Sequence, residues 1–473
     1  MKNIKINRGW LGILIAIQIL SACKVSKDVT VPDTNLPAVY ADAGTDTSSI
    51  AKIPWSMFFN DPELKALIGE AITHNNDLQV ALKDIEAADL TLRQVKLGNI
   101  PSLGMQASAN TSRPSDNSLN GLSLRQYNFA SKHIENYTAA ASLSWEADLW
   151  GKIRSRKAAA LAAYLGTNEA RKVIQTKVVS DVARGYYNLL MLDAQLAIAK
   201  NNVQLNDSTL RIIQFQFDAG QVTSLAVQQA NAQKLAAAGL VPQFEQLITI
   251  QENALSVLTG SLPGNIRHQT DLASINVSGP IGAGIPLDLL SRRPDVKQAE
   301  LALAAANGYV GYAKANMYPS LAITAQAGLD AFKVSNWFTI PASLFGAVAG
   351  SLTQPLFYQK KLSAAYQVAK VRREQTVITF RQSILVAVGE VSNILVAINK
   401  LEQQQIFAAE RVTTLQQATR NSQQLFSNGL ATYLEVITAQ GNVLQGELEL
   451  AGIRLSQLDA RVDLYRAVGG GWQ

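Results

Sequence analysis

Prolines are missing from two long stretches of the chain. All 14 prolines lie at or before Pro355, and none lies between Pro114 and Pro242. Because a proline inside a helix kinks or breaks it, these gaps allow helices far longer than the globular average of about 11 to 12 residues. The sequence predicts one helix over about 152–218 and another over about 359–427. At 1.5 Å per residue, the second would be roughly 100 Å long.

The C-terminal arm also carries a heptad seam. Apolar and small residues follow one another there at alternating spacings of three and four, as in a coiled coil, and the period of about 3.5 residues predicts a left-handed supercoil. The seam consists of Leu434, Ile437, Gly441, Leu444, Leu448, Ala451, Leu455, Leu458, Val462 and Tyr465. An ordinary globular domain has no need of helices this long, so the pattern favours an elongated helical structure.

A glycine turn divides each helical run, and this layout occurs twice. The stretch FDAGQVTSLAV (217–227) contains Gly220, and FSNGLATYLEV (426–436) contains Gly429 at the corresponding position, 209 residues later. A long helical hairpin needs a residue that tolerates positive φ where the chain reverses, and glycine does so without strain. We interpret the repetition as an internal duplication.

Three shorter segments alternate polar and apolar residues with period two, which is typical of a strand with one apolar face, and a fourth segment is predicted as the counterpart of the second in the duplicated half. They are residues 100–112, residues 136–148, residues 318–330 and a stretch that starts at Phe345. The last is the weakest, because residues 334–359 carry no charge and are long enough for a transmembrane helix. Four helix-breaking residues favour a β-hairpin there instead: Pro341, Gly346, Gly350 and Pro355.

Strands of about 10 to 13 residues with one apolar and one polar face suit tilted strands that cross a bilayer. Four strands cannot close a barrel, and an open sheet edge in lipid would leave backbone groups unpaired. The sequence therefore predicts a barrel to which several chains contribute. Its water-filled lumen would be lined by the polar residues of the second strand: Asn136, Thr138, Ser142, Ser144 and Glu146.

The N-terminus has the pattern of an export signal. A basic start and an apolar run precede the tetrapeptide Leu20-Ser21-Ala22-Cys23. This tetrapeptide resembles the bacterial lipobox, which implies cleavage before Cys23 and a covalent lipid on its thiol. The alternative is a plain signal peptide followed by a leftover cysteine. Because Cys23 is the only cysteine, we expect neither a disulfide nor a thiolate metal site.

The sequence gives little support to an enzyme or to a nucleic-acid-binding protein. Its three histidines, His74, His133 and His268, are scattered without metal-ligand spacing, and no GxSxG or phosphate-binding loop is present. The formal charge of +6 includes three basic residues of the predicted signal peptide, so the remaining excess is too small to indicate nucleic acid. We expect no catalytic activity, metal or cofactor apart from the lipid on Cys23.

Four motifs, in the same order along the chain, resemble the TolC-like outer membrane factor family, in particular its lipoprotein branch. They are WSMFFNDPELKALIGEAITHNNDL from Trp55, SWEADLWGKIRS from Ser144, IPLDLLSRRPDVKQAELALAAANGYVGYAKANMYPSL from Ile285 and LYRAVGGGW from Leu464. The resemblance covers nearly the whole mature chain. It implies a homotrimer with a twelve-stranded outer-membrane barrel that continues into an α-helical tunnel through the periplasm.

The same resemblance implies the function and the partners. The chain would be the exit duct of a tripartite efflux pump, passively conducting small toxic compounds, drugs or metals, to the exterior. It would meet a periplasmic adaptor and an inner-membrane pump of the RND type, and lie lipid-anchored in the outer membrane of a Gram-negative bacterium. The competing interpretation is a lipid-anchored, coiled-coil periplasmic protein that forms no channel. Neither the substrate nor the cognate pump can be inferred from the sequence.

The expected fold class is an α+β membrane protein. It combines a transmembrane β-barrel, with four strands per chain shared in a trimer, and a long α-helical coiled-coil tunnel built by internal duplication. The expected segments are a signal peptide at 1–22, a lipid-anchored extended segment at 23–60, a first repeat at 61–270, and a second repeat with the C-terminus at 271–473.

The glycine turns are the expected contacts with the adaptor. By resemblance, four residues of the two hairpin tips would meet it: Gly220, Val222, Gly429 and Leu430. The alternative is that both glycines only turn the chain and meet no partner.

A closed pore would be narrowed near the same tips. Some family members carry acidic residues just past the second glycine, where this chain has Ala431 and Thr432, so an acidic gate at that place is doubtful. Asp218, Thr432 and Glu435 are the remaining candidates for a pore aperture, and the two carboxylates could equally stabilise helix ends.

Trp145 and Trp150, near the end of the second strand, are candidates for the bilayer interface, where tryptophan is enriched. Packing at the junction of barrel and helix is the equal alternative. The motif SRRPD indicates a helix that begins at Pro294 with Asp295 in its first turn, and Arg292 and Arg293 are expected to form structural ion pairs.

Overall fold

The computed structural model describes residues 27–30, 40, 49–127, 132–275 and 282–473. The predicted signal peptide and Cys23 lie outside this range. The chain divides into two compact units. We call them the sheet unit (Met1–Val31, Ala87–Tyr164 and Leu301–Ile378) and the helical unit (Pro32–Glu86, Leu165–Glu300 and Thr379–Gln473).

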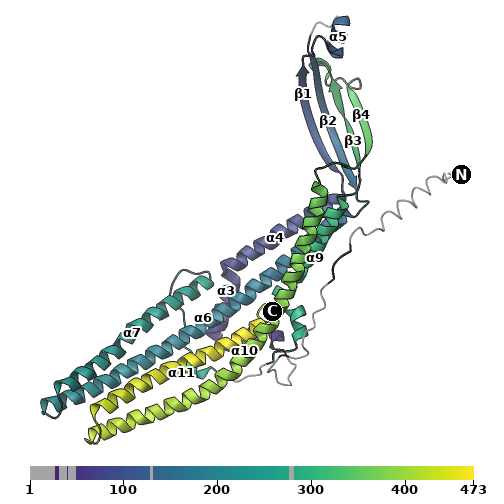
Figure 1. The fold of residues 1–473 in the computed structure, drawn as a ribbon. Coiled ribbons are helices and arrows are strands. Elements are labelled where there is room, and N and C mark those ends of the chain that lie inside the picture. Colours follow the sequence, from purple (N-terminus) through teal and green to yellow (C-terminus); the bar gives the residue numbers. More distant parts are fainter. Residues whose placement is uncertain (1–26, 31–39, 41–48, 128–131, 276–281) are drawn as a thin grey trace. The chain divides into compact units, whose positions relative to one another are not determined.

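The sheet unit contains an antiparallel four-stranded sheet with the strand order β1-β2-β3-β4 (Figure 1). The strands are β1 (Ser102–Ser112), β2 (Ile134–Ala147), β3 (Ser320–Ala331) and β4 (Leu344–Thr353). All four predicted strands are confirmed. The doubtful segment 334–359 holds the short helix η5 (Val334–Asn336) and β4 and is not a transmembrane helix. Between β1 and β2 lies α5 (Leu119–Gln126).

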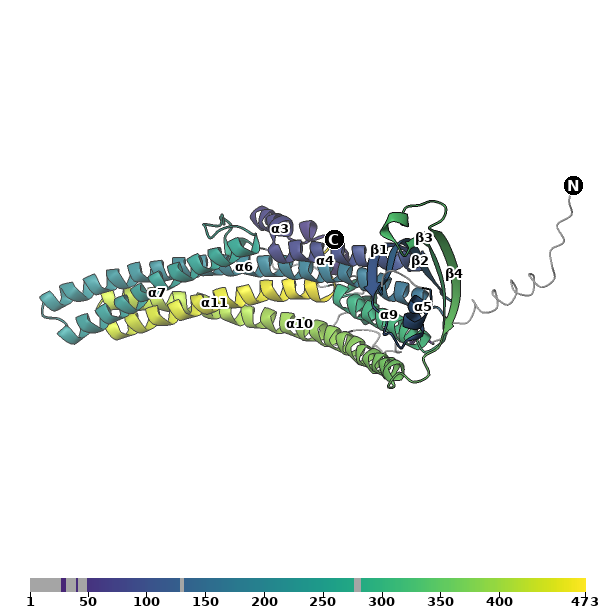
Figure 2. The same cartoon turned by 90° about the horizontal axis from the view of Figure 1, so that it is seen from above.

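Four long helices form two hairpins. They are α6 (Lys152–Asp218) with α7 (Ser224–Leu258), and α10 (Lys361–Ser427) with α11 (Tyr433–Ala467). In the helical unit these helices lie side by side, as Figures 1 and 2 show. The predicted long helices are confirmed, although α10 begins at Lys361 because Gln359 and Lys360 have positive φ. Pro242 lies inside α7 without ending it.

The two hairpins have the same dimensions. Both α6 and α10 contain 67 residues, and both α7 and α11 contain 35. Each element of the second hairpin begins 209 residues after its counterpart in the first. A duplication accounts for these equal lengths simply, and as a statement about the origin of the chain it stays a prediction.

Shorter elements connect the strands and the long helices along the chain. The helices are α2 (Trp55–Phe58), α3 (Pro62–His74), α4 (Asn76–Lys96), α8 (Leu289–Arg292) and α9 (Pro294–Ala315), and the 3-10 turns are η1 (Ile50–Lys52), η2 (Leu97–Asn99), η3 (Leu272–Ser274) and η4 (Pro286–Asp288). Asp61 caps α3 by accepting hydrogen bonds from the backbone N–H groups of Glu63 and Leu64, as an N-cap residue should.

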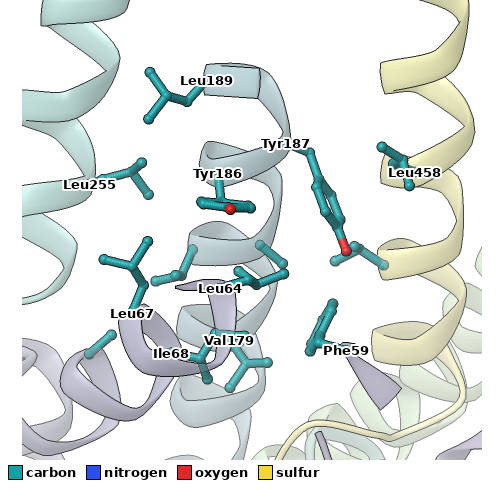
Figure 3. Packing of buried hydrophobic residues seen from close by; sticks show 14 of the residues in the cluster. Phe59, Leu64, Leu67, Ile68, Val179, Tyr186, Tyr187, Leu189, Leu255 and Leu458 are labelled. Atoms are coloured by element: carbon teal, nitrogen blue, oxygen red, sulfur yellow. The ribbon is translucent and has the colours of Figure 1, made fainter. Parts of the chain in front are cut away.

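The main apolar core of the helical unit packs α3 against α6, α7 and α11. Figure 3 shows Leu64, Leu67 and Ile68 of α3 facing Tyr186 of α6, and Leu255 of α7 lies against the same cluster. The Tyr186 hydroxyl donates a hydrogen bond to Asp61 at 3.0 Å, so the cap of α3 is joined to α6. Full burial of one leucine or isoleucine side chain contributes about 1.5 to 3 kcal/mol to stability. The apolar side chains of the short helix α3 therefore stabilise the hairpin α6–α7 against which they pack.

A second core contains a buried ion-pair network around Arg293, whose side chain is 7% exposed. The guanidinium lies 2.7 Å from both Asp295 and Glu390 and donates a hydrogen bond to the carbonyl of Ala467 at 3.0 Å. Partial burial would raise the pKa of Asp295, but the hydrogen bonds and charge of Arg293 outweigh it and hold that pKa below its usual value. The predicted helix start at Pro294 is confirmed, and the network ties α9, α10 and α11 together.

This network predicts unequal roles for two adjacent arginines. We expect Arg293→Ala to lower the free energy of unfolding by about 3 kcal/mol, because breaking a buried ion pair leaves its partners without a counter-charge. Arg292→Ala is the matched control, since its partner Asp288 lies 3.5 Å away and the pair is more exposed; its cost should stay below about 1 kcal/mol. Denaturant unfolding followed by circular dichroism measures both, and equal losses would contradict the assignment.

Candidate functional site

The sheet has two chemically different faces, and the strand register keeps them separate. Directly paired residues point to the same side of an antiparallel sheet. Ala141 is paired with Met105 and Ala327, whereas its neighbour Ser142 is paired with Gly104 and Gln326. Apolar residues therefore lie together on one face of the sheet, and polar residues lie together on the other.

The apolar face runs across all four strands. It contains Leu103, Met105, Ala107, Ala109, Tyr137, Ala139, Ala141, Leu143, Trp145, Leu321, Ile323, Ala325, Ala327, Leu329, Leu344, Val348 and Leu352. Met105 is 89% exposed and Val348 is 79% exposed. A contiguous apolar surface of this kind marks an interface with lipid or protein.

The polar face contains Ser102, Gln106, Ser108, Asn110, Asn136, Thr138, Ser142, Ser144, Glu146, Thr324, Gln326, Asp330 and Ser351. All five residues that we expect to line a lumen lie on it. Thr138 donates a hydrogen bond to Asp330 at 2.8 Å, so part of this face is joined across strands β2 and β3. Such a face suits contact with water.

The sheet has two open edges. Strand β1 pairs with β2 alone and β4 pairs with β3 alone, so among the described residues neither outer edge has a strand partner. Backbone N–H and C=O groups along these edges are free to pair with another strand.

Aromatic residues mark both ends of the apolar face. At one end, the Trp145 indole donates to the carbonyl of Asn99 at 2.9 Å, and Trp150 donates to Pro319 at 2.8 Å. At the other end, the Tyr137 ring lies 5.6 Å from that of Trp337. The step from residue 137 to 145 along β2 covers about 26 Å, close to the apolar band of about 25 Å in outer-membrane barrels.

The structure thus gives both tryptophans a packing role at the base of the strands. Trp150 also stacks on Tyr318, with ring centroids 4.9 Å apart. An indole that hydrogen bonds at one end and stays apolar elsewhere also suits a membrane interface. Their interface role stays a prediction.

The two hairpin tips have the same backbone geometry. Gly220 has a φ of 74° and Gly429 a φ of 73°, as predicted. The following residues close the turn identically: the N–H of Gln221 donates to Gln216 and that of Leu430 to Leu425, both at 2.8 Å. This six-to-one hydrogen bond defines the Schellman motif, and it requires the left-handed residue that glycine supplies.

The predicted tip residues differ in exposure. Leu430 is 76% exposed. Val222 is only partly exposed and packs against a small tip core, which contains Ile213, Ala226, Ala230, Phe426 and Val436. Leu430 thus lies on the exposed surface of its tip, whereas Val222 packs against the tip core.

The candidate aperture residues are engaged in helix ends. Glu435 accepts hydrogen bonds from the backbone N–H and the hydroxyl of Thr432, which forms a capping box at the start of α11. The hydrogen bonds from Thr432 lower the pKa of Glu435. Asp218 ends α6 and accepts a hydrogen bond from Gln214 at 3.0 Å. The helix-end alternative is supported for Glu435, which lies at the start of α11, but not for Asp218, because a carboxylate at the C-terminal end of a helix opposes the helix dipole.

Sequence reasoning missed the polar links between the two hairpins. Near the tips, the Tyr433 hydroxyl donates to Gln229 at 2.7 Å. Further along, the fully buried Gln440 donates to Thr209 at 2.7 Å, and Asn202 donates to the carbonyl of Gln440 at 3.2 Å. We call Gln440, Thr209 and Asn202 the buried polar layer. Its one sequence signal is Gln440, a polar residue directly before Gly441 of the heptad seam.

No group of three or more His, Cys, Asp or Glu side chains could hold a metal ion within the part of the chain that the structure describes. The candidate site therefore consists of surfaces: an amphipathic sheet and two helical tips.

Comparisons with known proteins agree with this arrangement. The family described as "Outer membrane efflux protein" matches residues 67–261 and 285–470. The solvent efflux pump outer membrane protein SrpC of Pseudomonas putida is 30% identical over 468 residues, covering 97% of both chains. The cation efflux system protein CusC of Escherichia coli is 27% identical over 459 residues, covering 96% of this chain and 97% of that protein.

Solved structures have the same fold. A CusC crystal structure matches with a TM-score of 0.80 and 25% identity, covering 93% of this chain and 99% of that chain. The open state of the MtrE outer membrane channel of Neisseria gonorrhoeae matches with a TM-score of 0.82 and 21% identity, covering 95% and 99%. The chain belongs to the outer membrane efflux protein family.

Proposed function

We propose that this chain forms the outer-membrane exit duct of a tripartite efflux pump in a Gram-negative bacterium. The observation that carries the proposal is a sheet with one polar face, one exposed apolar face and two open edges. Only closure with further strands in a lipid bilayer satisfies all three features. A coiled-coil periplasmic protein without a channel, the competing function, has no use for such a sheet.

The duct would be a homotrimer. Strand β4 of one copy pairs with β1 of the next, and three copies close a twelve-stranded barrel with the apolar face toward lipid. An exposed apolar stretch of helix α10 also favours assembly with other copies. Its most apolar 18-residue window has a mean hydropathy of 1.6, yet only 28% of that window is buried within the chain. Neighbouring copies would cover the rest, as exposed apolar surface requires.

The duplicated hairpins α6–α7 and α10–α11 would build a helical tunnel in the periplasm. Conduction would be passive, and opening would need the tip helices to move between a constricted and a dilated packing. Leu430, Gly220 and Gly429 are proposed to meet the hairpins of a periplasmic adaptor, which in turn docks an inner-membrane pump of the RND type. Val222 would support that surface from behind. The energy would come from the inner-membrane pump.

The closed pore would be narrowed near the hairpin tips. Asp218, Thr432 and Glu435 remain candidates to narrow the closed pore. Because Thr432 and Glu435 cap α11, they would act there by fixing the start of that helix rather than as free charges. Asp218 has a single local hydrogen bond, so its carboxylate is the better candidate to face the pore.

A lipid on Cys23 would anchor the chain in the outer membrane, with residues 1–22 removed and residues 23–60 leading from the anchor. The repeats at 61–270 and 271–473 are likewise proposed boundaries. The proposed cargo is small toxic compounds. The relatives named above are described for solvents in one case and for cations in the other, so the family tolerates chemically different cargo. The family consists of efflux proteins and not of enzymes.

The two faces of β4 give a direct test of the barrel. Val348 lies on the apolar face, and the adjacent Ala347, paired with Gln326, lies on the polar face. We expect Val348→Lys to cost about 2 to 4 kcal/mol of membrane insertion, as a lysine does on the lipid face of a barrel. Ala347→Lys should insert normally. Folding into lipid vesicles, followed by urea titration, measures both, and equal insertion would contradict the assigned faces.

The tips give a test of gating. The parent protein in planar bilayers should give small, rarely opening currents if the closed state is held at the periplasmic end. We expect Leu430→Glu combined with Gly429→Asp to increase the open probability by roughly tenfold, because new charges at adjacent tips repel one another. Leu262→Glu is the control, since Leu262 is also highly exposed but lies in the loop after α7. An open probability that does not change with the tip charges would place the gate elsewhere in the channel.

A further inference from the structure

The loop from β3 to β4, residues 332–343, is unusual for a loop at the end of a membrane barrel because it is apolar. Lys333 is its only charged residue, and residues 334–359 contain none. Phe338 is 69% exposed and Ile340 is 66% exposed. The connection between β1 and β2 is polar by contrast, with four charged residues: Arg113, Asp116, Arg125 and Lys132.

One aromatic contact places this loop on a definite side of the sheet. The Trp337 ring lies 5.6 Å from the Tyr137 ring and 5.0 Å from that of Phe338. Tyr137 belongs to the apolar face of β2, since Ala139 and Ala141 follow it at period two. The loop therefore extends the apolar face rather than bending over the polar one.

Several backbone N–H groups of the loop donate hydrogen bonds to carbonyl groups within the loop. Five backbone N–H groups donate to backbone carbonyls at 2.9 to 3.2 Å. The pairs, donor first, are Asn336 with Lys333, Trp337 with Val334, Thr339 with Asn336, Ser343 with Thr339, and Leu344 with Pro341. The backbone N–H of Asp330 donates to the carbonyl of Ser343 at 2.8 Å, and the Ser343 hydroxyl donates to the carbonyl of Asn336 at 2.6 Å. Irregular backbone does not lie exposed in the hydrocarbon, so the backbone of this loop would stay at the level of the headgroups while its apolar side chains reach toward the acyl chains.

We propose that the β3–β4 loop is a lipid-contacting anchor, in which Phe338 and Ile340 lie among the acyl chains of the outer leaflet beside the barrel wall. Apart from Lys333 at its start the loop carries no charge, and this together with the continuity with the apolar face favours lipid over an aqueous or protein partner. Trp337 and Tyr137 lie at the base of the anchor, where amphipathic rings favour the interface. This inference rests on the proposed barrel, whose apolar face supplies the adjoining lipid contact.

Fluorescence quenching in proteoliposomes tests the anchor. A bimane label is placed at Phe338→Cys, with Ile340→Cys as a second site in the loop. Val348→Cys on the apolar face of β4 reports insertion of the sheet, and Leu119→Cys in α5 reports the charged loop. Cys23 stays native, and the labelled parent protein gives its background. Brominated acyl chains quench labels in lipid, and iodide quenches labels in water.

We expect brominated lipid to quench positions 338, 340 and 348 about threefold more than position 119, with the reverse order for iodide. Lipid quenching at 348 without quenching at 338 and 340 would overturn the anchor and leave the duct intact. Protection of the loop from both quenchers would also overturn it, because a neighbouring copy would then cover the loop. Absence of lipid quenching at 348 would overturn the barrel wall together with the anchor.

Discussion

A backbone N–H or C=O group that faces lipid without a hydrogen-bond partner costs several kcal/mol, and this constraint governs the sheet. The four strands pair with one another but leave one edge of β1 and one edge of β4 open. In the proposed duct the apolar face lies against lipid, and lipid does not tolerate those edges. The two demands are compatible there if strands of other copies continue the sheet, so the proposed membrane location and the proposed assembly rest on the same feature.

Different interactions hold the two hairpins of the helical unit. Toward α3, the large core around Tyr186 and the ion pairs of Arg293 tie several helices together. Toward the tips, the apolar contacts reduce to a small core around Phe426, and single polar links such as Tyr433 with Gln229 join the hairpins. Resistance to local opening follows buried contacts. The core end should therefore stay fixed under conditions in which the tips can separate.

The sequence predicted the elements well because their signals are local. The period of two identified β1, β2 and β3, whereas β4 was predicted from helix-breaking residues and from its correspondence with β2. The gap in prolines allowed the helix predicted over about 152–218, and α6 has these bounds. The capping box of Thr432, the layer of Gln440 and the partners of Arg293 were not predicted in detail. Each depends on which residues meet across distant segments, and a single sequence does not encode that register in any short pattern. The start of α10 was missed by two residues because Gln359 and Lys360 adopt positive φ.

The buried layer of Gln440, Thr209 and Asn202 limits how the tips can move. An apolar seam permits one helix to slide past another, since neighbouring apolar positions are nearly equivalent. A buried amide is not equivalent to its neighbours, because sliding would leave it without a partner at a cost of about 1 to 3 kcal/mol. Buried polar residues in coiled coils fix register in this way. The layer therefore opposes sliding of α11 along α6, and separation of the tips by bending beyond Gln440 keeps its hydrogen bonds intact.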